Sequence, residues 1–461
     1  MRGSANHRNR IPDSMLRRSQ VKPGQQEQPG MPSRISNCRA LAAVAVTVFV
    51  LAGFPASAQA AVQPIAAGDS ALQLRAMAGL SIERINAHVF KPPHTLFIDS
   101  EDAADLPVTA VQTLPLKVAA KSLDANAFAA QLDGLLKGLT AGYAISLRKG
   151  GAPLITYVKP YARTPGNGGT AWSLDTRMHI ASVSKFITAV ATAAALAQQG
   201  SNADRKIQVD LPFRWHLGNN VNQITYRHLL THGSGFVTGG SASDYETMKW
   251  KVYTGAGAVG SYHYENMNFG LCRLLIPVLV GNISRDHRFP PQVDQDKAWD
   301  AATIEHYKNF VQSTVFNRAG VSNASFAPAG PSGALAYGMP AAGGWDSGDL
   351  ATMSGGAGWR LSVNELMKVM NTFRRKGTIM SPAAAQALLD SKFGIDNIFQ
   401  TPLGNMYVKN GRWRRNGQTE QCVAFFLPQD MELVVFVNSP IGVSGESLKG
   451  LVKTLYLNNL K

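Results

Sequence analysis

Ser182 and Lys185 are the residues of this 461-residue chain whose types and spacing best suit covalent chemistry. They fit the pattern S-x-x-K at the start of a long, Ala-rich apolar segment. On a helix this spacing places two side chains on one face, one turn apart. A serine hydroxyl becomes a strong nucleophile when a neighbour takes its proton, and a lysine in a dry pocket can do so. The pair therefore predicts a nucleophile and its proton acceptor at the start of a buried helix.

Three segments fit S-x-x-K, and their surroundings distinguish them. Ser19 and Lys22 lie in the N-terminal leader. Ser146 and Lys149 lie on an alternating, strand-like run, where residues three apart point to opposite faces. Only the third match opens a helix. The alternative interpretation of Lys185 is a surface lysine whose methylene chain covers apolar surface.

Tyr264 and Asn266 fit the pattern Y-x-N in the segment "SYHYENMNFG". A phenol beside a lysine can act as a general base, and an asparagine amide can hold a substrate carbonyl. The alternative interpretation of this segment is an ordinary turn before the next helix.

Lys409, Asn410 and Gly411 form a third candidate group within the strand-like run "YVKNGRW". A lysine on a strand can anchor a carboxylate, and a glycine lets a ligand approach the backbone. The following amide, of Arg412, can serve as an oxyanion donor. Because Asn-Gly is also the commonest hairpin turn, the alternative interpretation is a turn. A second Asn-Gly follows at 416–417 and makes the better turn.

The elements that must position these residues indicate an α+β fold. Helical periodicity and capping signals predict helices at 124–139, 182–198, 362–373 and 446–460. Strand-like runs predict a hairpin at 142–162 and consecutive strands at 405–413, 419–428 and 431–440. The intervening 201–360 is rich in Gly, Pro and Asn, and we expect mostly loops there. One antiparallel sheet with strands from both ends of the domain, flanked by helices and beside a mostly helical region, fits this order.

The three groups together resemble the penicillin-recognising serine hydrolase superfamily, and specifically its class C β-lactamase-related branch. The resemblance covers roughly 124–461 and includes "LDTRMHIASVSKFITA", "ITYRHLLTHGSGF", "GSYHYENMNFG" and "GGAGWRLSVNELMKVMNTFRRKGTIMSP" in the order of that branch. It implies a β-lactamase/transpeptidase-like fold and an acyl-enzyme mechanism. Ser182 would be acylated, Lys185 would be its proton partner, Tyr264 the base or relay, Asn266 a substrate contact, and Lys409 the basic residue of the third motif.

Two positions depart from the pattern of that branch. Glu265 occupies the middle of Y-x-N, where serine or alanine is usual, and this predicts a carboxylate near the mouth of the cleft. The third motif is K-N-G instead of K-T-G or H-T-G, and Arg415-Asn416-Gly417 is an alternative match. The branch includes β-lactamases, D,D-peptidases, D-amino-acid peptidases and esterases, so we expect a β-lactam, a D-amino-acid peptide or an ester as substrate. A non-catalytic protein that senses cell-wall fragments or β-lactams is the alternative from another class.

The N-terminus has the features of an export signal. Arg34 and Arg39 precede the apolar run "ALAAVAVTVFVLAGF" and the segment "PASAQA", which predicts cleavage after Ala58 or Ala60. We therefore expect a leader at 1–60, an N-terminal extension or linker at 61–123, a hydrolase domain at 124–461, and a periplasmic or secreted protein. The formal net charge is +15, and a basic body favours association with an anionic cell envelope.

Other patterns exclude several kinds of site. No H-E-x-x-H motif or clustered His/Cys set occurs, so we expect no metal and no cofactor. "GAGAVG" leads into the tyrosine segment instead of a helix, and no dense basic run occurs, so we expect no nucleotide or nucleic-acid partner. His232 is interpreted as a turn residue, not a base. Cys272 and Cys422 are either two buried thiols or, in an exported protein, a disulfide.

Overall fold

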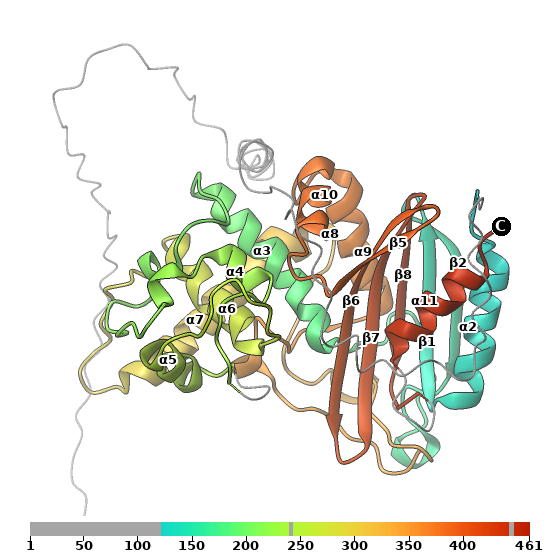
Figure 1. Cartoon of the computed structure of the whole chain (residues 1–461). Coiled ribbons are helices and arrows are strands. Elements are labelled where there is room, and N and C mark those ends of the chain that lie inside the picture. Colours follow the sequence, from blue (N-terminus) through green and yellow to red (C-terminus); the bar gives the residue numbers. More distant parts are fainter. Residues whose placement is uncertain (1–120, 239–242, 442–446) are drawn as a thin grey trace, which may run out of the picture. The chain divides into compact units, whose positions relative to one another are not determined.

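A computed structural model describes residues 121–238, 243–441 and 447–461 of the chain (Figure 1). The predicted leader and almost all of the predicted 61–123 extension lie outside these residues.

Six strands form one antiparallel sheet in the order β2-β1-β8-β7-β6-β5. The first and last strands of the fold, β1 and β8, are hydrogen-bonded neighbours at its interior, so the sheet joins both ends of the described chain. The strands are β1 (Gly142–Lys149), β2 (Ala152–Pro160), β5 (Asn397–Thr401), β6 (Gly404–Arg415), β7 (Gln418–Leu427) and β8 (Met431–Val437). The predicted α+β class with one antiparallel sheet is confirmed.

Helices cover both faces of this sheet (Figure 1). One face packs against α2 (Ala125–Leu139) and α11 (Leu448–Asn458), whose apolar stripes share a core with alternate residues of the strands. The other face belongs to the larger core, which also contains α3 (Ser184–Gln198), α9 (Val363–Asn371) and α10 (Pro382–Asp390). A two-stranded sheet pairs β3 (Met178–His179), which precedes α3 in the chain, with β4 (Arg360–Leu361), which precedes α9.

The segment 201–360 is more helical than expected. It contains α4 (Tyr226–Leu230), α5 (Tyr245–Thr254), α6 (Asn266–Leu279), α7 (Gln295–Val311) and the short α8 (Asn317–Ala319). Most residues of this segment lie outside helices, as predicted, but the sequence signals did not indicate α5 and α7, which side-chain caps help to stabilise. Asp244 and Asp294, for example, accept hydrogen bonds from first-turn amides of α5 and α7.

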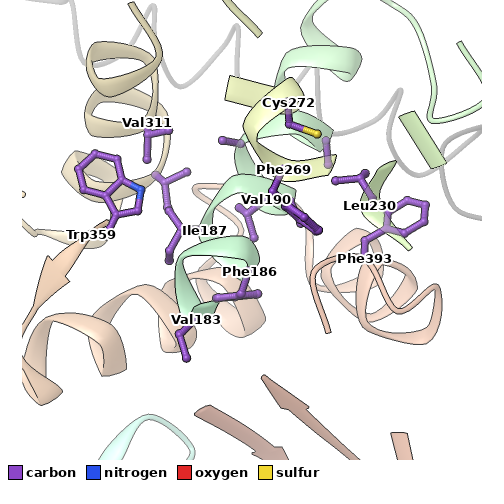
Figure 2. Packing of buried hydrophobic residues seen from close by; sticks show 14 of the residues in the cluster. Val183, Phe186, Ile187, Val190, Leu230, Phe269, Cys272, Val311, Trp359 and Phe393 are labelled. Carbon is purple, nitrogen blue, oxygen red and sulfur yellow. The ribbon is translucent and has the colours of Figure 1, made fainter. Parts of the chain in front are cut away.

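Helix α3 is the central element of the larger core. Fourteen of its 15 residues are buried, which explains a sequence that is apolar on nearly all sides. Figure 2 shows Phe186, Ile187 and Val190 among residues from distant segments, including Phe269 and Trp359. Within the described part of the chain, 181–198 is the one helical stretch long and apolar enough to cross a membrane, and 89% of it is buried inside the domain.

The end of α3 and the start of α9 lie where the local sequence signals predict them. Helix α3 ends before Gly200, which adopts a left-handed φ of 62°. Helix α9 begins with a capping box, in which the Ser362 hydroxyl accepts from the Glu365 amide (3.1 Å) and the Glu365 carboxylate accepts from the Ser362 amide (2.9 Å).

Candidate active site

Ser182 and Lys185 meet where a short 3-10 turn, η3 (Ala181–Val183), runs into α3. Lys185 Nζ lies 3.0 Å from Ser182 Oγ, so the predicted pair is in hydrogen-bond contact. Ser182 is half-buried and Lys185 is fully buried. Ala181 adopts a left-handed φ of 46°, an unfavourable conformation for a residue with a Cβ. Such strain is commonly retained where it positions a functional side chain.

The Lys185 ammonium is satisfied by oxygens from two other parts of the chain. It contacts Asn266 Oδ1 at the first residue of α6 and donates to the carbonyl of Gly356 (2.8 Å). The turn that presents this carbonyl requires glycine at Gly355, which has a φ of 90° and where a Cβ would lie 2.2 Å from the Phe269 carbonyl oxygen. These contacts explain how a lysine is tolerated in a buried helix, and they contradict the surface-lysine interpretation.

Tyr264 completes a cluster of three side chains. Its phenol oxygen lies 2.9 Å from Ser182 Oγ. Its ring centroid lies 4.9 Å from Lys185 Nζ and 5.3 Å from Lys409 Nζ. The first two predicted groups and the lysine of the third therefore converge around one phenol.

The third group lies on β6, which runs directly beside η3. A Cβ on Gly411 would lie 2.4 Å from the Ile180 carbonyl oxygen and 3.2 Å from the Ser182 amide nitrogen, so only glycine fits. The close approach that needs this glycine is that of the chain's own backbone, not of a ligand as the sequence suggested. It holds the β6 backbone against the amide of Ser182.

The Arg412 amide faces the edge of β6 that is not paired with β7. The β6–β7 register is continuous from Tyr407 to Arg415, and alternate amides of a strand point to the same side. The Asn410 amide donates to Asp396 on the side away from β7 (2.8 Å), so the amide two residues later faces that side too. The amides of Ser182 and Arg412 thus lie on either side of the close contact at Gly411.

Asn410 is placed differently from its neighbours. Strand alternation puts its side chain on the sheet face that carries Val408, which packs with α2 and α11, while Lys409 and Gly411 face Ser182. The side chain of Arg412 lies on the same far face as that of Asn410. The structure therefore brings together the side chains of five predicted residues: Ser182, Lys185, Tyr264, Asn266 and Lys409. Asn410 and Arg412 contribute only their backbone to this cluster, because their side chains lie on the other face of the sheet.

The alternative match Arg415-Asn416-Gly417 is the tip of the β6–β7 hairpin. Asn416 and Gly417 have φ values of 50° and 84°, as a two-residue hairpin turn requires. The Arg415 guanidinium lies over the ring of Trp345, 6.0 Å from its centroid. Of the two candidates, K-N-G is the one beside Ser182.

Asp396 is a site residue that sequence analysis missed. It lies immediately before β5, and its carboxylate forms a buried ion pair with Lys409. Burial raises the pKa of Asp396, but the charges of Lys409 and Lys449 and the hydrogen bonds from Lys409 and Asn410 outweigh this, so the pKa lies below its ordinary value. No local motif marks this aspartate, because it meets its partner only through the β5–β6 pairing.

His232 supports the phenol from behind. Its ring stacks on that of Tyr264 with centroids 4.3 Å apart, and its Nδ1 accepts a hydrogen bond from the Glu265 amide (3.2 Å). Burial, followed by the charges of Lys185 and Lys409, holds the pKa of His232 well below its usual range. The φ of 58° at His232 agrees with the predicted turn. The sequence did not predict the stacking of its ring on Tyr264.

Glu265 does not lie at the mouth of a cleft. It is buried, and its carboxylate accepts hydrogen bonds from the amide (2.7 Å) and the hydroxyl of Thr238. The expectation of a carboxylate at the cleft mouth was therefore wrong. The carboxylate instead holds the backbone and the hydroxyl of Thr238.

The two cysteines are free and buried. Burial raises the pKa of Cys272 to about 12, and it also raises the pKa of Cys422 well above its ordinary value. The interpretation as two buried thiols is confirmed, and such thiols are chemically inert.

Comparison with known proteins agrees with the family resemblance. The family model described as Beta-lactamase matches residues 127–291. No curated protein matches the chain. Several solved structures share the fold at 15–16% sequence identity, a level that speaks for the fold alone.

Three of these structures cover most of the chain. FmtA from Staphylococcus aureus has a TM-score of 0.54 and 15% identity over 80% of this chain and 97% of its own. A β-lactamase/D-alanine carboxypeptidase from Pseudomonas syringae has a TM-score of 0.54 and 16% identity over 72% and 96%. A class C β-lactamase from Rhodobacter sphaeroides has a TM-score of 0.52 and 16% identity over 72% and 98%. The chain therefore has the β-lactamase/transpeptidase-like fold, and its residues 127–291 match the Beta-lactamase family model.

Proposed function

We propose that this protein is an exported serine hydrolase that cleaves amide or ester bonds through an acyl-enzyme at Ser182. The observation that carries the proposal is the contact of one hydroxyl with two proton-accepting groups. Ser182 Oγ lies 3.0 Å from Lys185 Nζ and 2.9 Å from Tyr264 Oη. Activation of a serine requires an adjacent base that is itself held in place.

Lys185 acts as a neutral amine in the reactive state. A neutral amine has two N–H groups and one lone pair, and two oxygens, Asn266 Oδ1 and the Gly356 carbonyl, are placed to accept the two hydrogens. Lys185 Nζ is also in hydrogen-bond contact with Ser182 Oγ, and its neutral form can take the Ser182 proton as Oγ attacks the acyl carbon. Tyr264, on the other side of the same hydroxyl, can relay that proton to the leaving nitrogen or oxygen.

Charge develops on the carbonyl oxygen during this attack. The amides of Ser182 and Arg412 are the donors that we propose for it, since Gly411 lets β6 approach the turn η3 closely. The bond to the leaving group breaks, and an ester to Ser182 remains. Water, activated by the same base, then cleaves this ester and regenerates the hydroxyl.

A serine-reactive probe tests the proposal directly. We expect a fluorophosphonate, a serine-reactive probe without a carboxylate, to label the wild-type protein and not Ser182→Ala. Ser184→Ala is the matched control, since Ser184 is a neighbouring buried serine outside the cluster. Equal labelling of wild type and Ser182→Ala would refute the nucleophile.

Turnover separates an enzyme from a sensing protein. Rapid hydrolysis of an uncharged p-nitrophenyl ester supports the hydrolase. Permanent acylation, or binding without turnover, supports the non-catalytic alternative.

A further inference from the structure

We propose that Asp396 determines the substrate class of this site by excluding substrates with a carboxylate next to the scissile bond. The inference rests on the proposed function. It assigns the enzyme to uncharged esters or amides.

The ion pair between Asp396 and Lys409 is buried and doubly anchored. The side chains of Lys409 and Asp396 are 2% and 9% exposed, respectively. One carboxylate oxygen of Asp396 contacts Lys409 Nζ, and the other accepts the Asn410 amide at 2.8 Å. A carboxylate held at both oxygens from within the protein is not readily displaced by a ligand, because its removal would leave buried donors without an acceptor.

This pair changes what the lysine can do for a substrate. Lys409 Nζ lies 5.3 Å from the centre of the Tyr264 ring, so its charge is at the reacting cluster. A substrate carboxylate that approached this ammonium would also approach Asp396. Two carboxylates sharing one partly desolvated ammonium repel one another, and the incoming one loses its hydration without full compensation.

The other polar groups of β6 do not replace the lysine. The side chains of Arg412 and Arg414 lie on the far face of the sheet by alternation, and Arg415 is at the hairpin tip over Trp345. On the face that carries Lys409 and Gly411, the next residue is Trp413, whose ring packs edge-on against His179 with centroids 5.5 Å apart. The charge of Lys449 also acts on Asp396, but Lys449 comes from α11 on the other face of the sheet, where it contacts Asn397 at 2.8 Å. On the face of Ser182, an aromatic surface beside a lysine paired with Asp396 suits an apolar, uncharged group.

A matched pair of esters tests this inference. The pair shares one acyl group, and its leaving groups are phenol and meta-carboxyphenol. We expect wild-type kcat/KM to favour the phenyl ester by about tenfold or more after correction for their rates of spontaneous hydrolysis. Asp396→Asn keeps the size of the side chain and removes its charge, so we expect the preference to shift toward the carboxylated ester by about tenfold.

The control variant is Asp210→Asn. Asp210 is also a buried aspartate in an ion pair, with Arg205 at 2.7 Å, and it has no contact with the site residues described above. We expect its preference to equal that of the wild type. Because the preference is a ratio measured on one preparation, a smaller folded fraction does not change it.

The outcomes distinguish this inference from the proposed function. If the wild type hydrolyses neither ester and Ser182 is not labelled by probe, the proposed function is wrong. If the wild type hydrolyses the carboxylated ester as fast as its partner, or Asp396→Asn leaves the ratio unchanged, the inference alone is overturned.

A second measurement needs no variant. Phenylboronic acid and meta-carboxyphenylboronic acid form reversible adducts with active serines. We expect the uncharged compound to inhibit the wild type more tightly, by about fivefold or more. Tighter inhibition by the carboxylated compound would overturn the inference even if Asp396→Asn does not fold.

Discussion

The phenol oxygen of Tyr264 lies 2.9 Å from the hydroxyl oxygen of Ser182, although 82 positions separate the two residues. The contact joins the segment before α6 to the turn before α3. Its geometry lets one proton move between the two oxygens without rearrangement of the backbone. Loss of the phenol oxygen should therefore impair proton transfer at Ser182.

Tyr264→Phe removes only the phenol oxygen and keeps the ring that stacks on His232. We expect kcat for a p-nitrophenyl ester to fall by about 10²-fold or more, because general acid–base assistance is lost. The melting temperature should change little. A variant with kcat within about threefold of the wild type would show that the phenol takes no part in proton transfer.

Lys185→Ala removes the proposed proton acceptor and leaves Asn266 and the Gly356 carbonyl without their shared donor. We expect turnover to fall by about 10²-fold or more. Lys368→Ala, an exposed lysine on α9, is the control for the loss of a positive charge. Full activity of Lys185→Ala would mean that another base operates.

Gly411→Ala tests the contact between β6 and η3. The new methyl group would lie 2.4 Å from the Ile180 carbonyl oxygen, so the strand and the turn must move apart. We expect a loss of about 1–3 kcal/mol in the free energy of unfolding and a larger proportional loss of activity.

Gly134→Ala provides the matched control for that substitution. Gly134 lies in the middle of α2, and a Cβ there would have no neighbour within 4 Å. This variant should be more stable by about 0.5–1 kcal/mol and fully active. Equal behaviour of the two variants in chemical denaturation would contradict the close approach at Gly411.

His232 predicts a pH dependence of stability. Its pKa in the folded state is depressed below the value of 6.5 for an unperturbed histidine, so protons bind preferentially to the unfolded chain at lower pH. The stability that the neutral ring contributes is present above pH 6.5 and is lost as the pH falls below it. We compare the free energy of unfolding of wild type and His232→Gln between pH 7.5 and 5.5.

The wild type should lose more stability than His232→Gln over that interval. The difference between the two slopes should approach about 1.4 kcal/mol per pH unit below pH 6.5. Parallel curves would show that this histidine does not titrate differently in the two states.

Export is tested at the N-terminus. When the full chain is expressed in a bacterium with a general secretion pathway, we expect mature protein that begins at residue 59 or 61. Intact mass and N-terminal sequencing measure this start. Replacing Ala58 and Ala60 with lysine should retain the precursor, and unprocessed wild-type protein in the cytoplasm would contradict the signal.

The sequence by itself determined the local elements of this protein. Ser362 and Glu365 specify the start of α9, Asn416 and Gly417 specify the β6–β7 turn, and Gly200 ends α3. These features depend on backbone angles and on partners within a few residues, so they can be read without a fold. The motifs, through their family resemblance, also indicated the fold class.

Only the tertiary structure decided which side chains meet. It separated K-N-G beside Ser182 from R-N-G at a hairpin tip, and it placed Glu265 in the interior. It also revealed Asp396, because strand pairing alone brings that carboxylate to Lys409. Burial and charge compensation depend on how distant parts of the chain pack together, so they cannot be predicted from a short segment of sequence.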